Sequence, residues 1–306
     1  MSAESSRLQP SLANQLVAIS VSDSADLGRL GLLERSLNQT VAALVSRLVG
    51  HGARIVYGGN LDQQGFTYRL YPAVAQAYAT AAVRAARPPF VHYVATYLMH
   101  DPAEVAAHVN AVSSFAEIRL VDQNRQVTTV VSAAKEVIGR TPTGEVLLKD
   151  TAAVTAFVAS LPRQSSVPAD DLDAMRAAME DAVSARIVIG GRVVGYSGRM
   201  PGILQETLLT LQKKHQLFLL GGFGGAARDA AITLGLMSPE NALKHLKVGP
   251  AYWETIELIG KFAGELREEA QNTGAWDDQV AAAKAEDPDV ASKHVMRGLT
   301  HRAYFR

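Results

Sequence analysis

Cysteine is absent from the 306-residue chain. Its absence excludes disulfides and thiolate chemistry, and a zinc site would have to rely on histidine and carboxylate ligands. The eight histidines are scattered, with no HxH or HExxH spacing. We therefore expect neither a metal site nor a metal cofactor.

An excess of charge of one sign is also lacking, because 30 basic residues balance 30 acidic ones. With no net field to attract polyanions, nucleic acid and membrane surfaces are not expected as partners. No apolar stretch approaches the roughly 20 residues of a membrane span. The opening MSAESSRLQPSLANQ lacks the basic and apolar segments of a signal peptide. These absences predict a soluble, cytoplasmic protein.

Apolar residues make up 48% of the chain and charged residues 20%, which is typical of a globular protein with a sizeable core. Short apolar runs predict buried strands at 16–21, 53–57, 90–97, 117–121, 186–189 and 216–220. Helical patterns alternate with them, at 33–49, 67–86, 168–183 and 201–213. This alternation predicts an α/β fold with a doubly wound, mainly parallel sheet and helices on both faces.

We divide the chain into three parts. A flexible leader covers residues 1–14, the main α/β domain covers 15–237, and a helical extension at 238–306 packs on the same domain. Residues 122–165 have a weaker pattern, since VTTVVSAAKEVIG suits either a helix or a strand and TPTGE is a turn.

Three glycine clusters directly follow predicted strands: Gly58-Gly59, Gly190-Gly191, and Gly221 to Gly225 around Phe223. Glycines placed between a strand and a helix let backbone N–H groups approach an anion, at the sheet edge where α/β proteins bind ligands. Each cluster alone could be a tight turn, but the three together predict a binding edge. None matches GxGxxG or GxxxxGK[ST], so a conventional NAD or ATP fold is disfavoured and no cofactor is expected.

The clusters also carry a family resemblance. ARIVYGGNLDQQGFT resembles the first glycine motif of the SLOG superfamily, and RIVIGGRVVGYSGRMPGILQE resembles its second, PGGxGTxxE. This superfamily includes the Lonely Guy phosphoribohydrolases, DprA, and the sensor domains of Thoeris defence proteins and melastatin-type TRP channels. The order of SVSDSADLGRLGL, YGGNLDQQGFT, AMRAAM and LGGFGG is most similar to SLOG domains of bacterial TIR-associated conflict proteins. The resemblance spans residues 16–299 and implies a Rossmann-like fold.

The resemblance implies a pocket with two walls and assigns residues to it. Arg199, beside a helix N-terminus, would hold phosphate bidentately, although it could equally be a solvated loop arginine. The ligand-binding residues that we expect are Ser22, Ser24, Gly58, Gly59, Asn60, Gly65, Phe66, Thr67, Gly190, Gly191, Arg192, Gly198, Arg199, Pro201, Gly202, Gly222, Phe223 and Gly224.

Arg176 and Glu206 match in place the catalytic pair of the Lonely Guy enzymes. A carboxylate could stabilise the oxocarbenium-like centre of N-glycosidic cleavage or activate water. Glu206 also lies in the first turns of a helix, where a carboxylate simply complements the dipole. The loop GRVVGYSGRMPG replaces the shorter PGGxGT of the enzymes, which puts hydrolysis in doubt and suits a larger, sensed ligand.

We therefore expect a domain that binds or senses a nucleotide-derived small molecule, of the ADP-ribose type. The resemblance implies anti-phage defence or nucleotide signalling as its setting. Because no effector is recognisable in the sequence, we also expect a homo-oligomer, dimer or tetramer, and an output through self-association or a separate effector protein. The alternatives are an N-glycosidic hydrolase that uses Glu206 and Arg176, and an oligomerising module with a vestigial pocket.

Overall fold

The strands form one sheet of ten members in a computed structural model, which describes residues 12–61, 65–81, 87–99, 101–133, 136–162, 167–245, 247–271, 280–283 and 287–302. The strands are β1 (Leu16–Ser22), β2 (Arg54–Gly58), β3 (Phe90–Ala95), β4 (Ala116–Val121), β5 (Val127–Ala133), β6 (Glu136–Thr141), β7 (Gly144–Leu148), β8 (Ala185–Gly190), β9 (Gln216–Leu220) and β10 (Val280–Ala282). Their order across the sheet is β10-β9-β8-β1-β2-β3-β4-β5-β6-β7.

The sheet is parallel from β10 to β4 and antiparallel from β4 to β7. The chain moves outward from β1 through β2, β3 and β4, and later returns to β8 on the other side of β1. The strand order therefore reverses between β1 and β8. In an open α/β sheet, this is where ligands bind, beyond the carboxyl ends of the strands.

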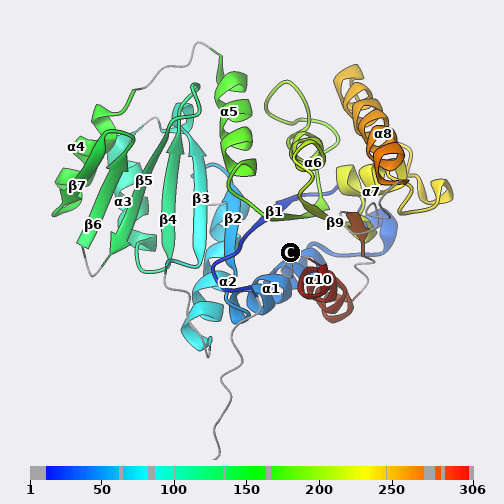
Figure 1. Cartoon of the computed structure of the whole chain (residues 1–306), viewed down its shortest axis with the longest axis horizontal. Helices are drawn as coiled ribbons and strands as arrows, with labels where there is room; N and C mark the ends of the chain where they lie inside the picture. Colours follow the sequence, from blue (N-terminus) through cyan, green and yellow to red (C-terminus); the bar gives the residue numbers. More distant parts are fainter. Residues whose placement is uncertain are drawn as a thin grey trace, which may run out of the picture.

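Helices cover both faces of the sheet (Figure 1). They are α1 (Glu34–Gly50), α2 (Phe66–Thr80), α3 (Pro102–Val112), α4 (Thr151–Ser160), α5 (Pro168–Glu180), α6 (Gly202–Gln212), α7 (Gly225–Thr233), α8 (Pro250–Gln271) and α10 (Pro288–Arg302). One face packs on α1 to α4 and α10, and the other packs on α5, α6 and α7, with α8 outside α6 and α7. The predicted doubly wound, mainly parallel α/β fold is confirmed.

The alternation of side chains along β1 shows how the sequence builds these two layers. Val17 and Ile19 pack in the core beneath α1, whereas Ala18 packs on the opposite face with α5. Successive residues of a strand point to opposite faces. Ser20 consequently faces the layer of α5 and α6, where it contacts Glu206 of α6.

The segments at the two ends of the chain pack on this core. Leu12 of the expected leader is buried, and its N–H donates to the carbonyl of His51. Asn14 also donates its N–H, to the carbonyl of Gly52, whereas residues 1–11 of that leader lie outside the described residues. At the other end, α10 packs on α1, and β10 extends the sheet beside β9. Residues 238–306, expected to be helical, thus also supply a strand. Within the described residues, no helix is long and apolar enough to cross a membrane.

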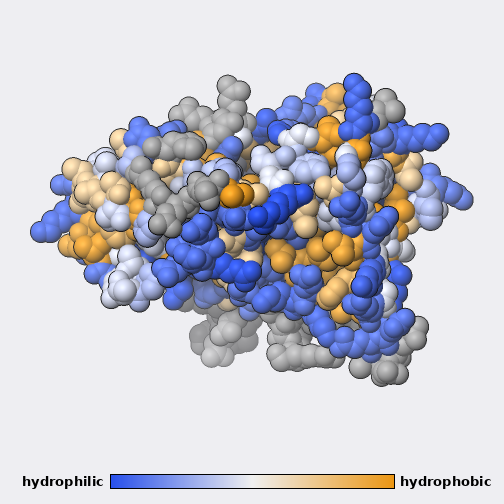
Figure 2. Space-filling model, turned by 90° about the horizontal axis from the view of Figure 1, so that it is seen from above, coloured by the Kyte–Doolittle hydropathy of each residue, from blue (hydrophilic) through white to orange (hydrophobic). Residues whose placement is uncertain are grey.

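The ambiguous segment at 122–165 forms the antiparallel strands β5 to β7 followed by α4. Its pattern is weak because the strands lie near the edge of the sheet and only part of each is buried. The space-filling view in Figure 2 shows hydrophobic residues scattered among hydrophilic ones at the end of the molecule where these strands lie.

Candidate functional site

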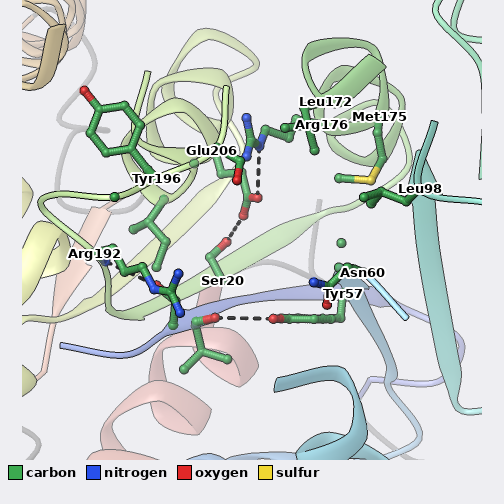
Figure 3. Close-up of a pocket in the computed structure, with 18 of the residues that line it drawn as sticks. Ser20, Tyr57, Asn60, Leu98, Leu172, Met175, Arg176, Arg192, Tyr196 and Glu206 are labelled. Carbon is green, nitrogen blue, oxygen red and sulfur yellow. Dashed lines mark hydrogen bonds and ion pairs between the residues drawn. The ribbon is translucent and has the colours of Figure 1, made fainter. Parts of the chain in front are cut away.

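A cavity of about 260 Å³ opens at the carboxyl edge of the sheet, beside the switch between β1 and β8 (Figure 3). Strand ends, α5, the start of α6 and the loop after β8 contribute its walls. The lining residues are Ser20, Val21, Ser22, Tyr57, Gly58, Gly59, Asn60, Tyr97, Leu98, Leu172, Met175, Arg176, Arg192, Gly195, Tyr196, Ser197, Gly202, Ile203 and Glu206.

The two ends of the cavity differ in chemistry. Leu98, Leu172 and Met175 form an apolar wall on one side, and Arg192 and Tyr196 lie on the other (Figure 3). A few polar groups that converge on a partly apolar hollow are typical of small-molecule sites. The cavity therefore suits a ligand with one flat apolar part and one anionic or polar part.

Glu206 lies in the second turn of α6 and is held from the strand side. Its Oε2 accepts hydrogen bonds from the Ser20 hydroxyl and from Nη1 of Arg186, the latter at 2.8 Å. Arg186 Nη1 also donates to the Ser20 hydroxyl at 2.7 Å. The carboxylate is thus fixed by two donors, and its Oε1 remains on the side of Arg176.

Arg186 is the buried centre of this network, with no exposed side-chain surface. Its guanidinium pairs with both Glu180 and Glu206, and its Nε donates to the Thr210 hydroxyl at 2.8 Å. Burial acts to raise the pKa of Glu180, but Arg186 and His215 outweigh it and hold that pKa below its usual value. A buried cation that is paired on two sides fixes the geometry of strand β8 against α5 and α6.

Arg176 reaches the cavity from α5 and lies against the first turn of α6. Its Nη1 donates to Oε1 of Gln205 at 2.5 Å, and its Nε lies 3.7 Å from Oε1 of Glu206. That Nε is buried and has no hydrogen-bond partner. A Cβ at Gly202 would lie only 2.6 Å from Nη2, so glycine at this position admits the guanidinium.

Arg192 is more exposed, at 57% of its side chain, and pairs with Asp23 at 3.3 Å. Its backbone N–H donates to the hydroxyl of Ser22 at 3.2 Å. This bond ties the loop after β8 to the end of β1. Because its ion pair is solvent-exposed and weak, the guanidinium of Arg192 is free to turn toward an anion.

The structure brings some of the expected residues together. The cavity is lined by Ser22, Gly58, Gly59, Asn60, Arg192 and Gly202, and by the expected catalytic pair Arg176 and Glu206. Thr67 supports this wall without lining it, since its hydroxyl donates to the Asn60 carbonyl at 2.9 Å. The other expected ligand-binding residues do not line it: Ser24, Gly65, Phe66, Gly190, Gly191, Gly198, Arg199, Pro201, Gly222, Phe223 and Gly224.

Arg199, which the sequence favoured as the phosphate-binding cation, turns toward α5 instead. It forms ion pairs with Asp170 and with Asp173, the latter at 3.2 Å. Its side chain is 58% exposed, nearly the same as that of Arg192. The two arginines thus differ in direction rather than in burial, and Arg192 is the one at the cavity.

The third glycine cluster is occupied by the chain itself. The N–H of Gly225, at the start of α7, donates to Oδ2 of Asp26 at 2.7 Å, and Asp26 is buried. Gly225 has φ +62°, and a Cβ there would lie 2.3 Å from the Gly191 carbonyl oxygen. The anion at this helix N-terminus is therefore an internal carboxylate, and the glycines let the loops after β8 and β9 pack together.

Several site residues were missed from the sequence: Ser20, Tyr97, Leu98, Leu172, Met175, Arg186 and Tyr196. A full charge within a predicted buried strand was a usable signal for Arg186. The apolar wall carries no such signal, because leucine and methionine in helices are ordinary core residues. His92 of β3 is also buried, and its Nδ1 lies 3.0 Å from the Tyr71 hydroxyl.

Among the described residues, no group of three or more histidine or carboxylate side chains could hold a metal ion. No curated protein matches the chain. The model of one protein family, described as SLOG cluster2, matches residues 11–251. This range includes β1, β2, β8 and all the residues that line the cavity. The chain therefore belongs to the SLOG cluster2 family.

Proposed function

We propose that this chain binds a nucleotide-derived small molecule of the ADP-ribose type in the cavity beside β1 and β8. Family membership supports a nucleotide-related ligand-binding or glycosidase-like domain. The observation that carries the proposal is the pairing of an apolar wall with an arginine-bearing one in a single cavity. A nucleotide needs both, because its base packs on an apolar surface and its phosphate binds a cation.

The base packs against Leu98, Leu172 and Met175, where flat apolar surface is removed from water. The phosphate lies near Arg192 and the first turn of α6. Gly202 lines the cavity there, and the unbonded N–H groups of a helix start favour an anion. The unpartnered Nε of Arg176 adds a buried donor at the same end of α6.

Binding without turnover is supported by the long loop GRVVGYSGRMPG after β8, which replaces the shorter PGGxGT of the enzymes. One carboxylate oxygen of Glu206 already accepts from Ser20 and Arg186, so the other is the one that could reach a ligand. The second candidate is an N-glycosidic hydrolase, supported by the presence of Glu206 and Arg176 in the same cavity. In that case Oε1 of Glu206 would stabilise the reacting sugar or orient water.

Calorimetry with AMP, ADP-ribose and cyclic ADP-ribose tests the proposal. Arg192→Ala is expected to weaken binding by about tenfold or more, since a charge-assisted hydrogen bond contributes about 1.5–3 kcal/mol. Arg199→Ala is the matched control, because this arginine lies in the same loop and is equally exposed but faces α5. The affinity of the Arg199→Ala variant for each nucleotide should stay at the wild-type value.

Chromatography of the same mixtures separates the two candidates. A binder leaves each nucleotide intact, whereas a hydrolase releases free base, and Glu206→Gln would then abolish the release. The proposal fails if no nucleotide of the series binds. It also fails if Arg199→Ala weakens binding as much as Arg192→Ala does.

The biological setting rests on family resemblance alone. A role in bacterial anti-phage defence or nucleotide signalling would require an output. A homo-oligomer or a separate effector protein would provide it. The homo-oligomer and the effector protein both belong to this proposal. The effector is tested by asking whether a second protein copurifies with the tagged chain in the presence of ADP-ribose and in its absence.

A further inference from the structure

The sheet ends on β7, which has β6 on one side and no strand on the other among the described residues. β7 lies at the far left of Figure 1, away from the cavity. Residues 144–147 are exposed, and only Leu148 is buried. A free strand edge presents unpaired N–H and C=O groups that can pair with another chain.

The edge is apolar on both faces of the sheet. Val146 is 45% exposed and Leu147 is 42% exposed, and as neighbours in a strand they point to opposite faces. Leu147 lies directly opposite Ile138 of β6, so the two form a short apolar row. The strand itself contains no proline. Its one charge is Glu145, whose Oε1 pairs with Arg140 of β6 at 2.7 Å; this pair is solvent-exposed and weak, so the carboxylate can also face a second cation.

The sequence Glu145-Val146-Leu147-Leu148-Lys149 is complementary to itself when read antiparallel. A two-fold axis at Leu147 places this residue opposite its own copy. It also places Glu145 opposite Lys149 on both sides of the axis, and opposite charges that face each other across strands stabilise a pairing. In a strand, alternate residues direct their N–H and C=O groups to the same side. The outward groups of β7 belong either to residues 145, 147 and 149 or to residues 146 and 148, and both sets are symmetric about Leu147, so the register is possible in either case.

We infer that β7 pairs antiparallel with β7 of a second copy of this chain, with Leu147 on the two-fold axis. The two ten-stranded sheets then continue into one. The row of Ile138 and Leu147 extends across the axis into the same row of the partner, which removes both leucines from water. This isologous contact closes on itself, as symmetric dimers do, and leaves the cavity of each copy open.

A charge-swap series on the full-length protein tests the register by sedimentation over a dilution series. Lys149→Glu places a second carboxylate opposite Glu145 on both sides of the axis and is expected to raise the dimer dissociation constant by about tenfold. The double variant Glu145→Lys with Lys149→Glu restores opposite charges in the same register. It is expected to lower the constant again toward the wild-type value, short of it by the cost of a lysine beside Arg140 of β6.

The absence of cysteine allows a second, independent measurement. A cysteine at position 147 would meet its own copy at the Cα separation of about 4.5–5.5 Å between facing residues in antiparallel strands, which a disulfide can span. Leu147→Cys is therefore expected to form a cross-linked dimer under mild oxidation. Val146→Cys is the matched control, because it is equally exposed but would face Leu148 of the other copy.

Far-UV circular dichroism establishes that each variant is folded. The inference is overturned if the protein is a monomer at every concentration, or if Lys149→Glu leaves the dimer dissociation constant unchanged. Equal cross-linking of Leu147→Cys and Val146→Cys also overturns it. Dissociation by the single swap, recovery in the double variant and selective cross-linking at 147 support it.

Discussion

Arg186 places a full positive charge inside strand β8, where no part of its side chain is exposed. Only the pairing with Glu180 and Glu206 makes this burial tolerable. Arg186→Met keeps a side chain of similar length but leaves two carboxylates buried without their cation. We expect it to lower the free energy of unfolding by about 3–5 kcal/mol in urea titrations.

Arg199→Met is the control for Arg186, because it removes an arginine whose ion pairs are solvent-exposed. It should change the free energy of unfolding by no more than about 0.5 kcal/mol. If the two variants lose the same stability, the buried network does not hold β8 in place.

His245 provides a pH-dependent contact between the segment before α8 and Asp229 in the middle of α7. The hydrogen bond that Nε2 of His245 donates to the Asp229 carboxylate, at 2.9 Å, raises the pKa of His245; burial and Arg29 act against this, and the charges of Asp229 and Asp26 add to it. The folded chain therefore binds this proton more tightly than the unfolded chain. The resulting stability is fully present below about pH 6.5 and is lost as the pH rises through the folded pKa.

Comparison with His245→Gln isolates this contribution. The stability advantage of the wild type over the variant should shrink as urea titrations move from about pH 6 to about pH 9. The wild type must be compared with the variant because other histidines also make stability depend on pH. Burial lowers the pKa of His92 to about 3 and that of His108 to about 4, so their contribution to stability falls as the pH falls, opposite to that of His245. A difference that is constant with pH would contradict the role of His245.

At the scale of elements, the loops after β8 and β9 are locked by backbone contact. Gly225, with φ +62°, leaves no room for a Cβ, which would lie 2.3 Å from the Gly191 carbonyl oxygen. Gly195 has a similar φ, +65°, but nothing lies within 4 Å of its Cβ position. Gly195→Ala should cost about 1 kcal/mol from the left-handed backbone alone, and Gly225→Ala about 2 kcal/mol more.

Thermal unfolding of these two alanine variants measures the difference directly. Equal losses would mean that the loops shift apart at little cost. A larger loss at Gly225 that leaves nucleotide affinity unchanged would support its assignment to packing rather than to the ligand.

The parallel strands other than β10, and the sheet edge at which the cavity lies, could be predicted because their signals are local. A short apolar run followed by glycine identifies β2, β8 and β9 without knowledge of their neighbours. The direction of a side chain in a long loop is not local, so the sequence could not rank Arg192 above Arg199. Likewise, the third glycine cluster resembles an anion site, and only the fold reveals that Asp26 already fills it.

At the scale of the whole molecule, the family match ends at residue 251, but the chain beyond it still adds a strand to the sheet and a helix that packs on it. β10 lies beside β9, and α10 packs on α1, where Arg47 pairs with Asp289 at 3.0 Å. The residues beyond the match thus cover the same core that positions β1 under the cavity. We expect them to unfold together with it, as one cooperative unit.

Two valines of α10 test this integration, because both become alanine but only one is buried. Val295 has no exposed surface and Val290 is 57% exposed. Val295→Ala should lower the free energy of unfolding by about 2 kcal/mol, from lost burial and the cavity left behind. Val290→Ala should change it by no more than about 0.5 kcal/mol. Helix propensity favours alanine in the helix interior, at Val295 more than in the first turn at Val290, so a larger loss at Val295 comes from the core and not from propensity. In the Val295→Ala variant, circular dichroism and tryptophan fluorescence should follow a single transition with a lower midpoint. A separate early transition, with the main one unmoved, would instead mean that the C-terminal helix folds independently of the sheet.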